Sequence, residues 1–244
     1  MTRLSINLNK VALLRNQRDC GYPSVLGAAK AVIAAGAHGI TIHPRPDERH
    51  IRRTDVYELE VLLKSLPSIE FNIEGYPTPD FLELVCSISC DQVTLVPDAP
   101  DQRTSDHGWD VAGHFNELKD VVFKIKNSGA RVSVFIDPNP DIARLAAQIG
   151  ADRIELYTGP YFEKTIPLTV YQVTADTAIS CGLGVNAGHD LNLENLSRFI
   201  KAIPECKEVS IGHAITSDAL DMGWDRAVKA YLAAIGNEIS IIQR

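Results

Sequence analysis

The feature that most constrains the fold of this chain is a regular alternation of short β-rich runs with longer stretches of helical spacing. Most of the β-rich runs are continuously apolar, as expected for strands that are covered on both faces. A glycine or proline usually ends each helical stretch. The β-rich runs are residues 4–8, 39–43, 70–74, 92–96, 131–136, 153–157, 184–186 and 208–211, and the helical stretches are 22–35, 55–65, 79–89, 110–128, 141–149, 167–181, 192–203 and 217–235.

This alternation predicts an α/β protein built as a (β/α)8 TIM barrel with parallel strands. The alternative is an open doubly wound sheet. No glycine-rich GxGxxG or GxxxxGK[ST] motif follows the first run, which favours the barrel over the nucleotide-binding versions of the open sheet. Because no linker or low-complexity segment interrupts the pattern, we expect residues 1–244 to form one barrel domain.

Charge and hydropathy narrow the class of partner. The formal net charge is −7 and no basic run is present, which argues against binding to nucleic acid or to an anionic membrane. No apolar run approaches the length of about 18 residues that a membrane-spanning helix needs. The five cysteines include no CxxC pair, so we expect reduced thiols in a cytoplasmic protein.

Residues capable of chemistry stand where the β-rich runs end. In a (β/α)8 barrel all these ends open on one rim, so side chains distant in sequence converge on one pocket. The long polar loop 96–108 is expected to border the same pocket. The strand-end residues are Asn7, Asn9, His43, Arg45, Glu74, Glu155, Asn186, His189, Gly212 and His213.

Three of these residues are candidates for acid–base work. Glu74 lies in an otherwise apolar run, and burial raises the pKa of a carboxyl group toward the range of a general base. A structural ion pair between Glu74 and an arginine of a neighbouring strand is the alternative. For His43 the alternative is a hydrogen-bonded structural histidine, and for His189 it is a turn residue that faces solvent.

Two segments predict anion sites. Residues 44–53 contain four arginines and His50, and the planar guanidinium group suits phosphate. Gly212-His213 leads from the last β-rich run into a helix, where backbone N–H groups bind phosphate in many barrels. Two anion sites suit two phosphorylated substrates or one bisphosphate. The alternative interpretation of residues 44–53 is a basic loop that is exposed to solvent.

Several strings in this order resemble the pyridoxine 5'-phosphate synthase family. The most specific are the pattern His-x-Arg-x-Asp-x-Arg-His from His43 to His50 and the string Val-Asn-Ala-Gly-His that ends at His189. Neither string would suffice alone, but together with the others they extend over nearly the whole chain. The matching segments are residues 7–16, 39–51, 72–74, 95–97, 134–137, 155–159, 185–189 and 211–214.

The resemblance implies a reaction and a set of roles. The family condenses 1-deoxy-D-xylulose 5-phosphate with 3-amino-2-oxopropyl phosphate and forms pyridoxine 5'-phosphate, phosphate and water. The resemblance also implies that the chain forms a homo-octamer and works without a metal or an organic cofactor. By the same resemblance His43 and Glu74 accept protons and His189 donates one. The xylulose phosphate is expected to be held by Asn9, Lys10, Arg18, Arg45, His50 and Thr104. The aminoketone phosphate is expected to be held by Asn7, Asp190, Gly212 and His213.

This chain departs from the family pattern at two places. Asn9-Lys10 stands where the family usually has Asp-His, and Asp190 stands where glycine is common. If this position acts through its backbone N–H, the change to Asp190 is tolerable, whereas a carboxylate directed at a phosphate would repel it. We interpret both departures as subfamily variation that leaves the reaction intact.

Two other functions are compatible with the same residues. One is a metal-dependent sugar-phosphate aldolase or epimerase, with His43, Glu74 and His189 as ligands of an open zinc site. The other is a non-catalytic barrel that binds a phosphosugar. The joint presence of the three acid–base residues favours an enzyme over this second alternative.

Overall fold

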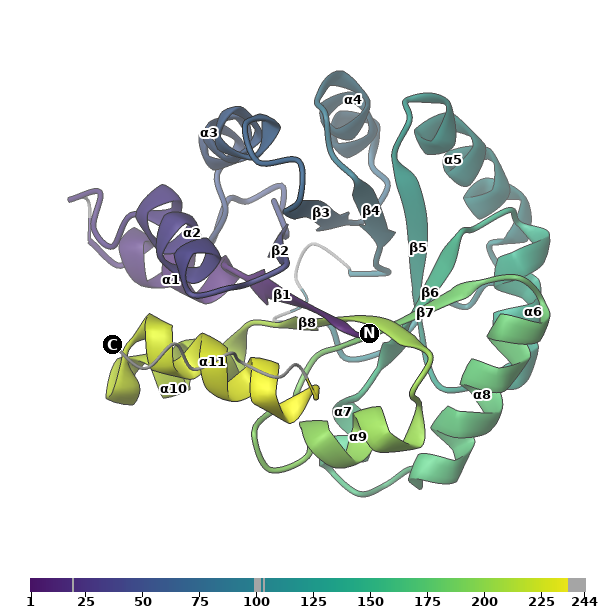
Figure 1. The fold of residues 1–244 in the computed structure, drawn as a ribbon. Coiled ribbons are helices and arrows are strands. Elements are labelled where there is room, and N and C mark those ends of the chain that lie inside the picture. Colours follow the sequence, from purple (N-terminus) through teal and green to yellow (C-terminus); the bar gives the residue numbers. More distant parts are fainter. Residues whose placement is uncertain (19, 99–101, 103, 237–244) are drawn as a thin grey trace.

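A computed structural model describes residues 1–18, 20–98, 102 and 104–236. Eight parallel strands close into a barrel in sequence order, and the last strand pairs with the first (Figure 1). The predicted (β/α)8 fold is therefore confirmed, and the open sheet is wrong. The strands are β1 (Arg3–Asn7), β2 (Gly39–Ile42), β3 (Glu70–Gly75), β4 (Gln92–Leu95), β5 (Arg131–Ile136), β6 (Arg153–Tyr157), β7 (Gly184–Gly188) and β8 (Cys206–Ile211).

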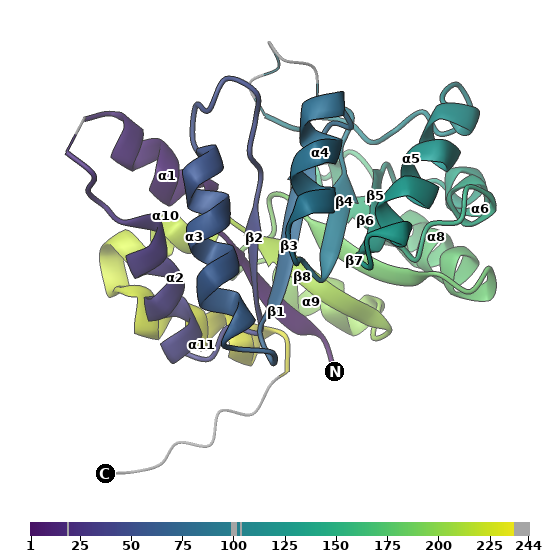
Figure 2. The ribbon, with the colours of Figure 1, turned by 90° about the horizontal axis from the view of Figure 1, so that it is seen from above.

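The helices form an outer ring around the strands (Figure 1). In the perpendicular view, the connections that follow β2 and β4 lie at the end of the barrel opposite the N-terminus (Figure 2). The helices are α1 (Asn9–Asn16), α2 (Val25–Ala34), α3 (Arg53–Lys64), α4 (Pro79–Ser87), α5 (Phe115–Asn127), α6 (Pro140–Gln148), α7 (Gly159–Phe162), α8 (Leu168–Ser180), α9 (Leu196–Ala202), α10 (His213–Met222) and α11 (Trp224–Ala234).

The sequence pattern was wrong for several helices. It missed α1, which follows β1 after one residue and has no side-chain cap at Leu8. The stretch 217–235 is two helices rather than one, because Gly223 has a φ of 79° and ends α10 before α11 begins. Helix α5 begins at Phe115 rather than at 110, and α9 begins at Leu196 rather than at 192.

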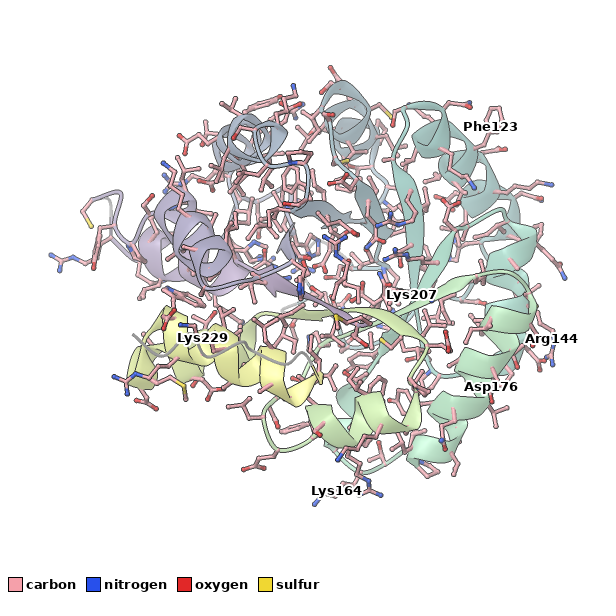
Figure 3. The ribbon with its side chains drawn as sticks, viewed as in Figure 1. Phe123, Arg144, Lys164, Asp176, Lys207 and Lys229 are labelled. Carbon is pink, nitrogen blue, oxygen red and sulfur yellow. The ribbon has the colours of Figure 1, made fainter. Side chains whose placement is uncertain are left out.

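The apolar core lies between the strands and the helical ring. Ile40, Ile73, Val134 and Ile154 are fully buried, and each precedes or follows a polar residue on its strand. Successive side chains of a strand point to opposite faces, so the barrel interior receives the polar set. Figure 3 shows charged side chains such as Arg144 and Lys229 on the outer surface of the helices.

The interior of the barrel is hydrogen-bonded rather than apolar. Ser5 Oγ lies 2.7 Å from Thr41 Oγ1, Asn72 Nδ2 donates to Thr41 Oγ1 at 3.3 Å, and Thr94 Oγ1 donates to Asn72 Oδ1 at 3.0 Å. Buried polar groups need such partners. At the N-terminal end of the strands, Glu70 pairs with Arg131. The catalytic candidates therefore lie above a polar layer that is hydrogen-bonded in part, since Ser133 Oγ and Gln92 Nε2 have no partner among the described residues.

Within the described residues, none of the helices is long and apolar enough to cross a membrane.

Candidate active site

His43 directly follows β2 and is buried, with 6% of its surface exposed. Its backbone N–H donates to Oδ1 of Asn9 at 2.9 Å, which ties the start of α1 to the end of β2. Its Nδ1 lies 3.9 Å from Oδ2 of Asp98. Burial, with the neighbouring charges of His50 and Arg45, lowers the pKa of His43 well below its usual value. The imidazole is therefore neutral near pH 7 and can accept a proton.

Glu74 lies in β3, and 9% of its surface is exposed. Nδ2 of Asn7, the last residue of β1, donates to Oε2 of Glu74 at 3.2 Å. Burial raises the pKa of Glu74 well above its usual value, and the charges of Glu155 and Asp98 raise it further. Among the described residues no arginine pairs with this carboxylate, so the structure does not support the ion-pair alternative.

His189 follows β7 in a turn with a φ of 70°. Thr158 Oγ1 donates to the carbonyl of Gly188 at 2.8 Å and also to that of His189, which fixes the turn. Both ring nitrogens have partners. Nδ1 lies 2.6 Å from Oδ2 of Asp190, and Nε2 lies 3.1 Å from Oγ1 of Thr104. These contacts oppose the interpretation of His189 as a solvent-facing turn residue.

Glu155 is a buried carboxyl group to which the sequence analysis gave no role. It lies in β6 between the fully buried Ile154 and Leu156, and burial raises its pKa to about 7. The charge of His189 opposes that shift. A Cβ at Gly188 would lie 2.1 Å from Oε1 of Glu155, so a larger residue there would require the carboxyl group of Glu155 to move. The available signal was a charged residue within an apolar strand that ends on the rim.

Electrostatic contacts connect the three catalytic candidates. Asp98 lies beside His43 and also raises the pKa of Glu74. Glu155 raises the pKa of Glu74, and His189 in turn lowers the pKa of Glu155. Such effects weaken as the distance between the charged groups grows. The C-terminal ends of β2, β3, β6 and β7 thus bring these side chains to the same end of the barrel.

The arginine-rich segment after β2 contributes Arg45 and His50. Arg45 is buried, donates to Oδ2 of Asp98 at 2.7 Å and also donates to the carbonyl of Gln102. The rings of His43 and His50 are 5.9 Å apart. Burial, with the charges of Arg45 and Arg49, lowers the pKa of His50 to about 4. Arg45 can therefore bind a phosphate only if its guanidinium group contacts the phosphate and Asp98 together, or if it leaves Asp98 for the phosphate.

A second group lies at the ends of β1, β7 and β8. The space that a Cβ of Gly212 would need is bordered by Asn7, whose Cβ is 3.1 Å away. His213 begins α10 and is exposed. The charges of His213 and Lys10 lower the pKa of Asp190, although the hydrogen bond from His189 is the largest cause. Asn7 and Gly212 are thus neighbours, and His213 and Lys10 act on the charge of Asp190 at the same end of the barrel.

Arg18 is the predicted substrate residue that the structure does not bring to this group. It is exposed in the connection between α1 and α2, which projects outward from the ring (Figure 1). Its backbone N–H donates to the carbonyl of Arg15 at 3.3 Å, so Arg18 stays next to the end of α1. Of the loop 96–108, residues 99–101 and 103 lie outside the described part of the chain; within it, Ser105 Oγ donates to Asp98 Oδ2 at 2.9 Å.

The residues that the structure describes contain no group of three or more His, Cys, Asp or Glu side chains arranged to hold a metal ion. His43, Glu74 and His189 therefore do not form the ligand set that the metal-dependent alternative requires.

Comparison with known proteins identifies close relatives. The family model "Pyridoxal phosphate biosynthesis protein PdxJ" matches residues 4–237. The chain is 49% identical to pyridoxine 5'-phosphate synthase of Brucella anthropi, over 96% of this chain and 98% of the relative. It is 50% identical to the protein of the same name in Bacteroides thetaiotaomicron, and the match covers 95% of this chain and 98% of the relative.

Solved structures share the fold at low sequence identity. Phosphoribosyl anthranilate isomerase from Thermotoga maritima is 15% identical with a TM-score of 0.64, and the match covers 98% of this chain and all of that one. Tryptophan synthase subunit alpha from Legionella pneumophila is 13% identical with a TM-score of 0.65, and the match covers 97% of this chain and 94% of that one. These likenesses bear on the fold alone.

Proposed function

Because the chain belongs to the PdxJ family of pyridoxal phosphate biosynthesis proteins, we propose that it condenses 1-deoxy-D-xylulose 5-phosphate with 3-amino-2-oxopropyl phosphate. The products are pyridoxine 5'-phosphate, inorganic phosphate and water. The observation that carries this proposal is the placement of His43, Glu74 and His189 at strand ends, joined by Asp98 and Glu155, in a chain half identical to named synthases.

The proposed reaction needs repeated proton transfers. Imine formation, phosphate elimination, addition of water and ring closure each move a proton at a different atom. We assign His43 and Glu74 as proton acceptors, because burial keeps the His43 imidazole neutral and raises the pKa of the Glu74 carboxyl group above its usual value. We assign His189 as a proton donor. Glu155, whose pKa is raised to about 7, lies beside this set and can exchange a proton with it.

Two phosphate groups anchor the substrates in this proposal. Asn9, Lys10, Arg18, Arg45, His50 and Thr104 hold the xylulose phosphate, and Asn7, Asp190, Gly212 and His213 hold the aminoketone phosphate. Holding both substrates makes the condensation effectively intramolecular, which lowers the barrier by about 7–11 kcal/mol in favourable cases. Arg18 joins the first set only if its segment, or that of a neighbouring subunit, approaches the rim.

Asp190 has a more specific role in our proposal. Its carboxylate binds the His189 ring at 2.6 Å, so it is directed at the imidazole rather than at a phosphate. Its backbone remains available to the substrate. The glycine common at this position in the family offers the same backbone without the carboxylate.

Other parts of the expected biology stay predictions. These are one barrel domain over residues 1–244, a homo-octamer, a cytoplasmic location, and activity without metal or organic cofactor. No described helix can cross a membrane, and the close relatives are bacterial biosynthetic proteins by name.

The direct test is to incubate the purified protein with both phosphorylated substrates. We expect pyridoxine 5'-phosphate and inorganic phosphate to appear in equal amounts, and neither when one substrate is omitted. Phosphate release from a single substrate, or a product other than pyridoxine 5'-phosphate, would contradict the proposal.

A further inference from the structure

The side-chain amide of Asn16 connects the end of α1 to the segment that carries His50. Its Nδ2 donates to the carbonyls of Glu48, Arg49 and His50 at 3.1, 3.1 and 2.8 Å. These partners lie 32 to 34 positions farther along the chain. The helix end does not need this amide, because the backbone N–H of Gln17 already binds carbonyls of the last turn of α1. The side chain of Asn16 therefore serves the distant segment rather than its own helix.

Arg15 supports the same contact from a buried position. Its Nη2 donates to the carbonyl of His50 at 3.0 Å, and its Nε donates to Oδ1 of Asn16 at 3.0 Å. Its Nη1 pairs with the buried carboxylate of Asp55 in α3. Oδ2 of Asp55 accepts a further hydrogen bond from the backbone N–H of Arg52 at 2.7 Å. The end of α1, the carbonyl of His50 and the start of α3 thus form one hydrogen-bonded network.

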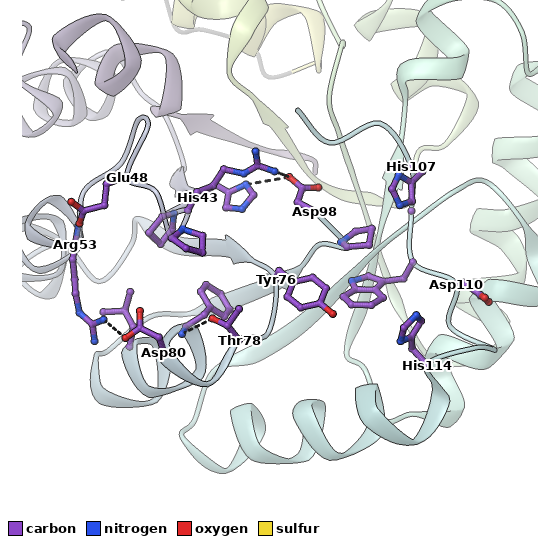
Figure 4. A pocket seen from close by; sticks show the side chains of 18 residues that line it. His43, Glu48, Arg53, Tyr76, Thr78, Asp80, Asp98, His107, Asp110 and His114 are labelled. Atoms are coloured by element: carbon purple, nitrogen blue, oxygen red, sulfur yellow. Dashed lines mark hydrogen bonds and ion pairs between the residues drawn. The ribbon is translucent and has the colours of Figure 1, made fainter. Parts of the chain in front are cut away.

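The beginning of the segment is held separately. Oε1 of Glu48 accepts a hydrogen bond from the backbone N–H of Arg53 at 2.8 Å, and Figure 4 shows these two residues close together. Glu48 has a φ of 50°, which residues other than glycine adopt only where surrounding contacts hold them. Because both of its ends are held, the segment has a defined geometry although it lies in a loop.

The direction of the His50 carbonyl decides which ring nitrogen carries the proton. This carbonyl and the N–H of Ile51 belong to one planar peptide unit and point in opposite directions. While the carbonyl is directed at Asn16, the N–H of Ile51 donates to Nδ1 of His50 at 2.9 Å. The pKa of His50 is lowered to about 4, so the ring is neutral at pH 7. Since Nδ1 is an acceptor, the single proton of the neutral ring lies on Nε2.

A ring in this form suits an anion. It offers one N–H donor, and its unprotonated nitrogen, which would repel a phosphate, is already occupied by Ile51. The carbonyls of the segment bind Asn16, which keeps their negative ends away from the anion. The His50 ring lies 5.9 Å from the ring of His43, so the donor is next to the candidate active site.

We propose that Asn16, supported by Arg15, is a positioning residue that keeps the proton of the His50 ring on Nε2, from which it is donated to the phosphate of 1-deoxy-D-xylulose 5-phosphate. Asn16 acts through His50 and not on the substrate. The contact with the phosphate rests on the proposed function, whereas the tautomer of His50 does not.

Nitrogen magnetic resonance of protein with labelled histidine, recorded at pH 7, tests the tautomer, because protonated and unprotonated ring nitrogens have well-separated chemical shifts. The signals of His50 are those that vanish in His50→Ala. We expect the Nε2–H tautomer in the wild type and in Gln17→Ala, which changes the exposed neighbour of Asn16. In Asn16→Ala we expect a mixture of the two tautomers. A wild type with the proton on Nδ1, or an Asn16→Ala protein with the wild-type tautomer, overturns the proposal.

Steady-state kinetics test the consequence for the substrate. In Asn16→Ala we expect KM for 1-deoxy-D-xylulose 5-phosphate to rise about tenfold, as for one lost hydrogen bond to a charged group, with kcat and the other KM within about twofold. Added to His50→Ala, the same change should raise KM no further, because both remove one donor. Additive rises, or equal rises in KM for both substrates, contradict the proposal. A protein with the predicted tautomer that does not turn over these substrates would refute the proposed function and leave the effect of Asn16 on the His50 tautomer in place.

Discussion

Nδ1 of His189 lies 2.6 Å from Oδ2 of Asp190, and both residues have positive φ, 70° and 48° respectively. The hydrogen bond from His189 lowers the pKa of Asp190, so its carboxylate stays ionised at neutral pH. A carboxylate on Nδ1 fixes the orientation and the tautomer of an imidazole and directs Nε2 away from itself. Here Nε2 is directed toward Thr104.

Asp190 should therefore affect the catalytic step more than substrate affinity. In Asp190→Gly the backbone keeps its freedom at positive φ, but the His189 ring loses its partner. We expect kcat to fall by about tenfold to a hundredfold, a loss consistent with a displaced acid–base group, with KM for 3-amino-2-oxopropyl phosphate nearly unchanged. Asp190→Asn keeps a hydrogen-bonding group and should recover part of kcat. A rise in KM alone would show that Asp190 holds the phosphate.

The pH dependence of stability should report on Glu155. Burial raises the pKa of this group from 4.5 in its exposed form to about 7 in the folded protein. Between these values the unfolded chain has released the proton and the folded protein retains it, so stability falls as pH rises through this window. Glu155→Gln has no titrating carboxyl group at this position, so this fall in stability with rising pH should disappear in the variant.

We expect the free energy of unfolding of Glu155→Gln to exceed that of the wild type increasingly from pH 4.5 to 7. The difference is at most about 3 kcal/mol. Denaturant unfolding at several pH values measures it, with Glu83→Gln on the exposed surface of α4 as the control. A difference between Glu155→Gln and the wild type that does not vary with pH would show that the carboxyl group is not perturbed.

Sequence analysis could predict the barrel because strand periodicity and stop residues are local signals. It could also predict that His43, Glu74 and His189 share a rim, since parallel strands of a barrel all end on one side. It could not identify Asp98, which contacts both His43 and Arg45. Nothing in the polar loop distinguishes that acid from its neighbours until the fold places it.

The break at Gly223 and the short helix α1 were missed for a related reason. Helical spacing continues through Gly223, and only its φ of 79° shows that the chain turns there. The role of Asp190 was also inaccessible, because the direction of its carboxylate depends on the geometry of the turn after β7.

Because Gly108 lies close to β5, we expect its substitution to lower the free energy of unfolding, whereas substitution of a glycine with more space should not. In Gly108→Ala the new Cβ would lie 2.1 Å from the backbone nitrogen of Asp137, and the loop must move. We expect a loss of about 1–3 kcal/mol in the free energy of unfolding. Gly27→Ala is the matched control, because its Cβ would meet only Ser24 at 3.3 Å inside α2. Thermal unfolding compares them, and equal melting temperatures would contradict this packing.

Chelation separates the proposed reaction from the metal-dependent alternative. Treatment with a chelator, followed by dialysis, should leave turnover of the two phosphorylated substrates unchanged. The reason is that His43, Glu74 and His189 act by proton transfer in our proposal. A loss of turnover that added zinc restores would support the aldolase or epimerase alternative instead.

The most direct test of the central claim is the turnover of Glu74→Gln. The amide keeps the size of the side chain and can still accept the hydrogen bond from Asn7, but it cannot take up a proton at neutral pH. We predict that kcat falls by about 10²–10⁴-fold while 1-deoxy-D-xylulose 5-phosphate binds with nearly the wild-type affinity. Turnover equal to that of the wild type would contradict the assignment of Glu74 as a proton acceptor.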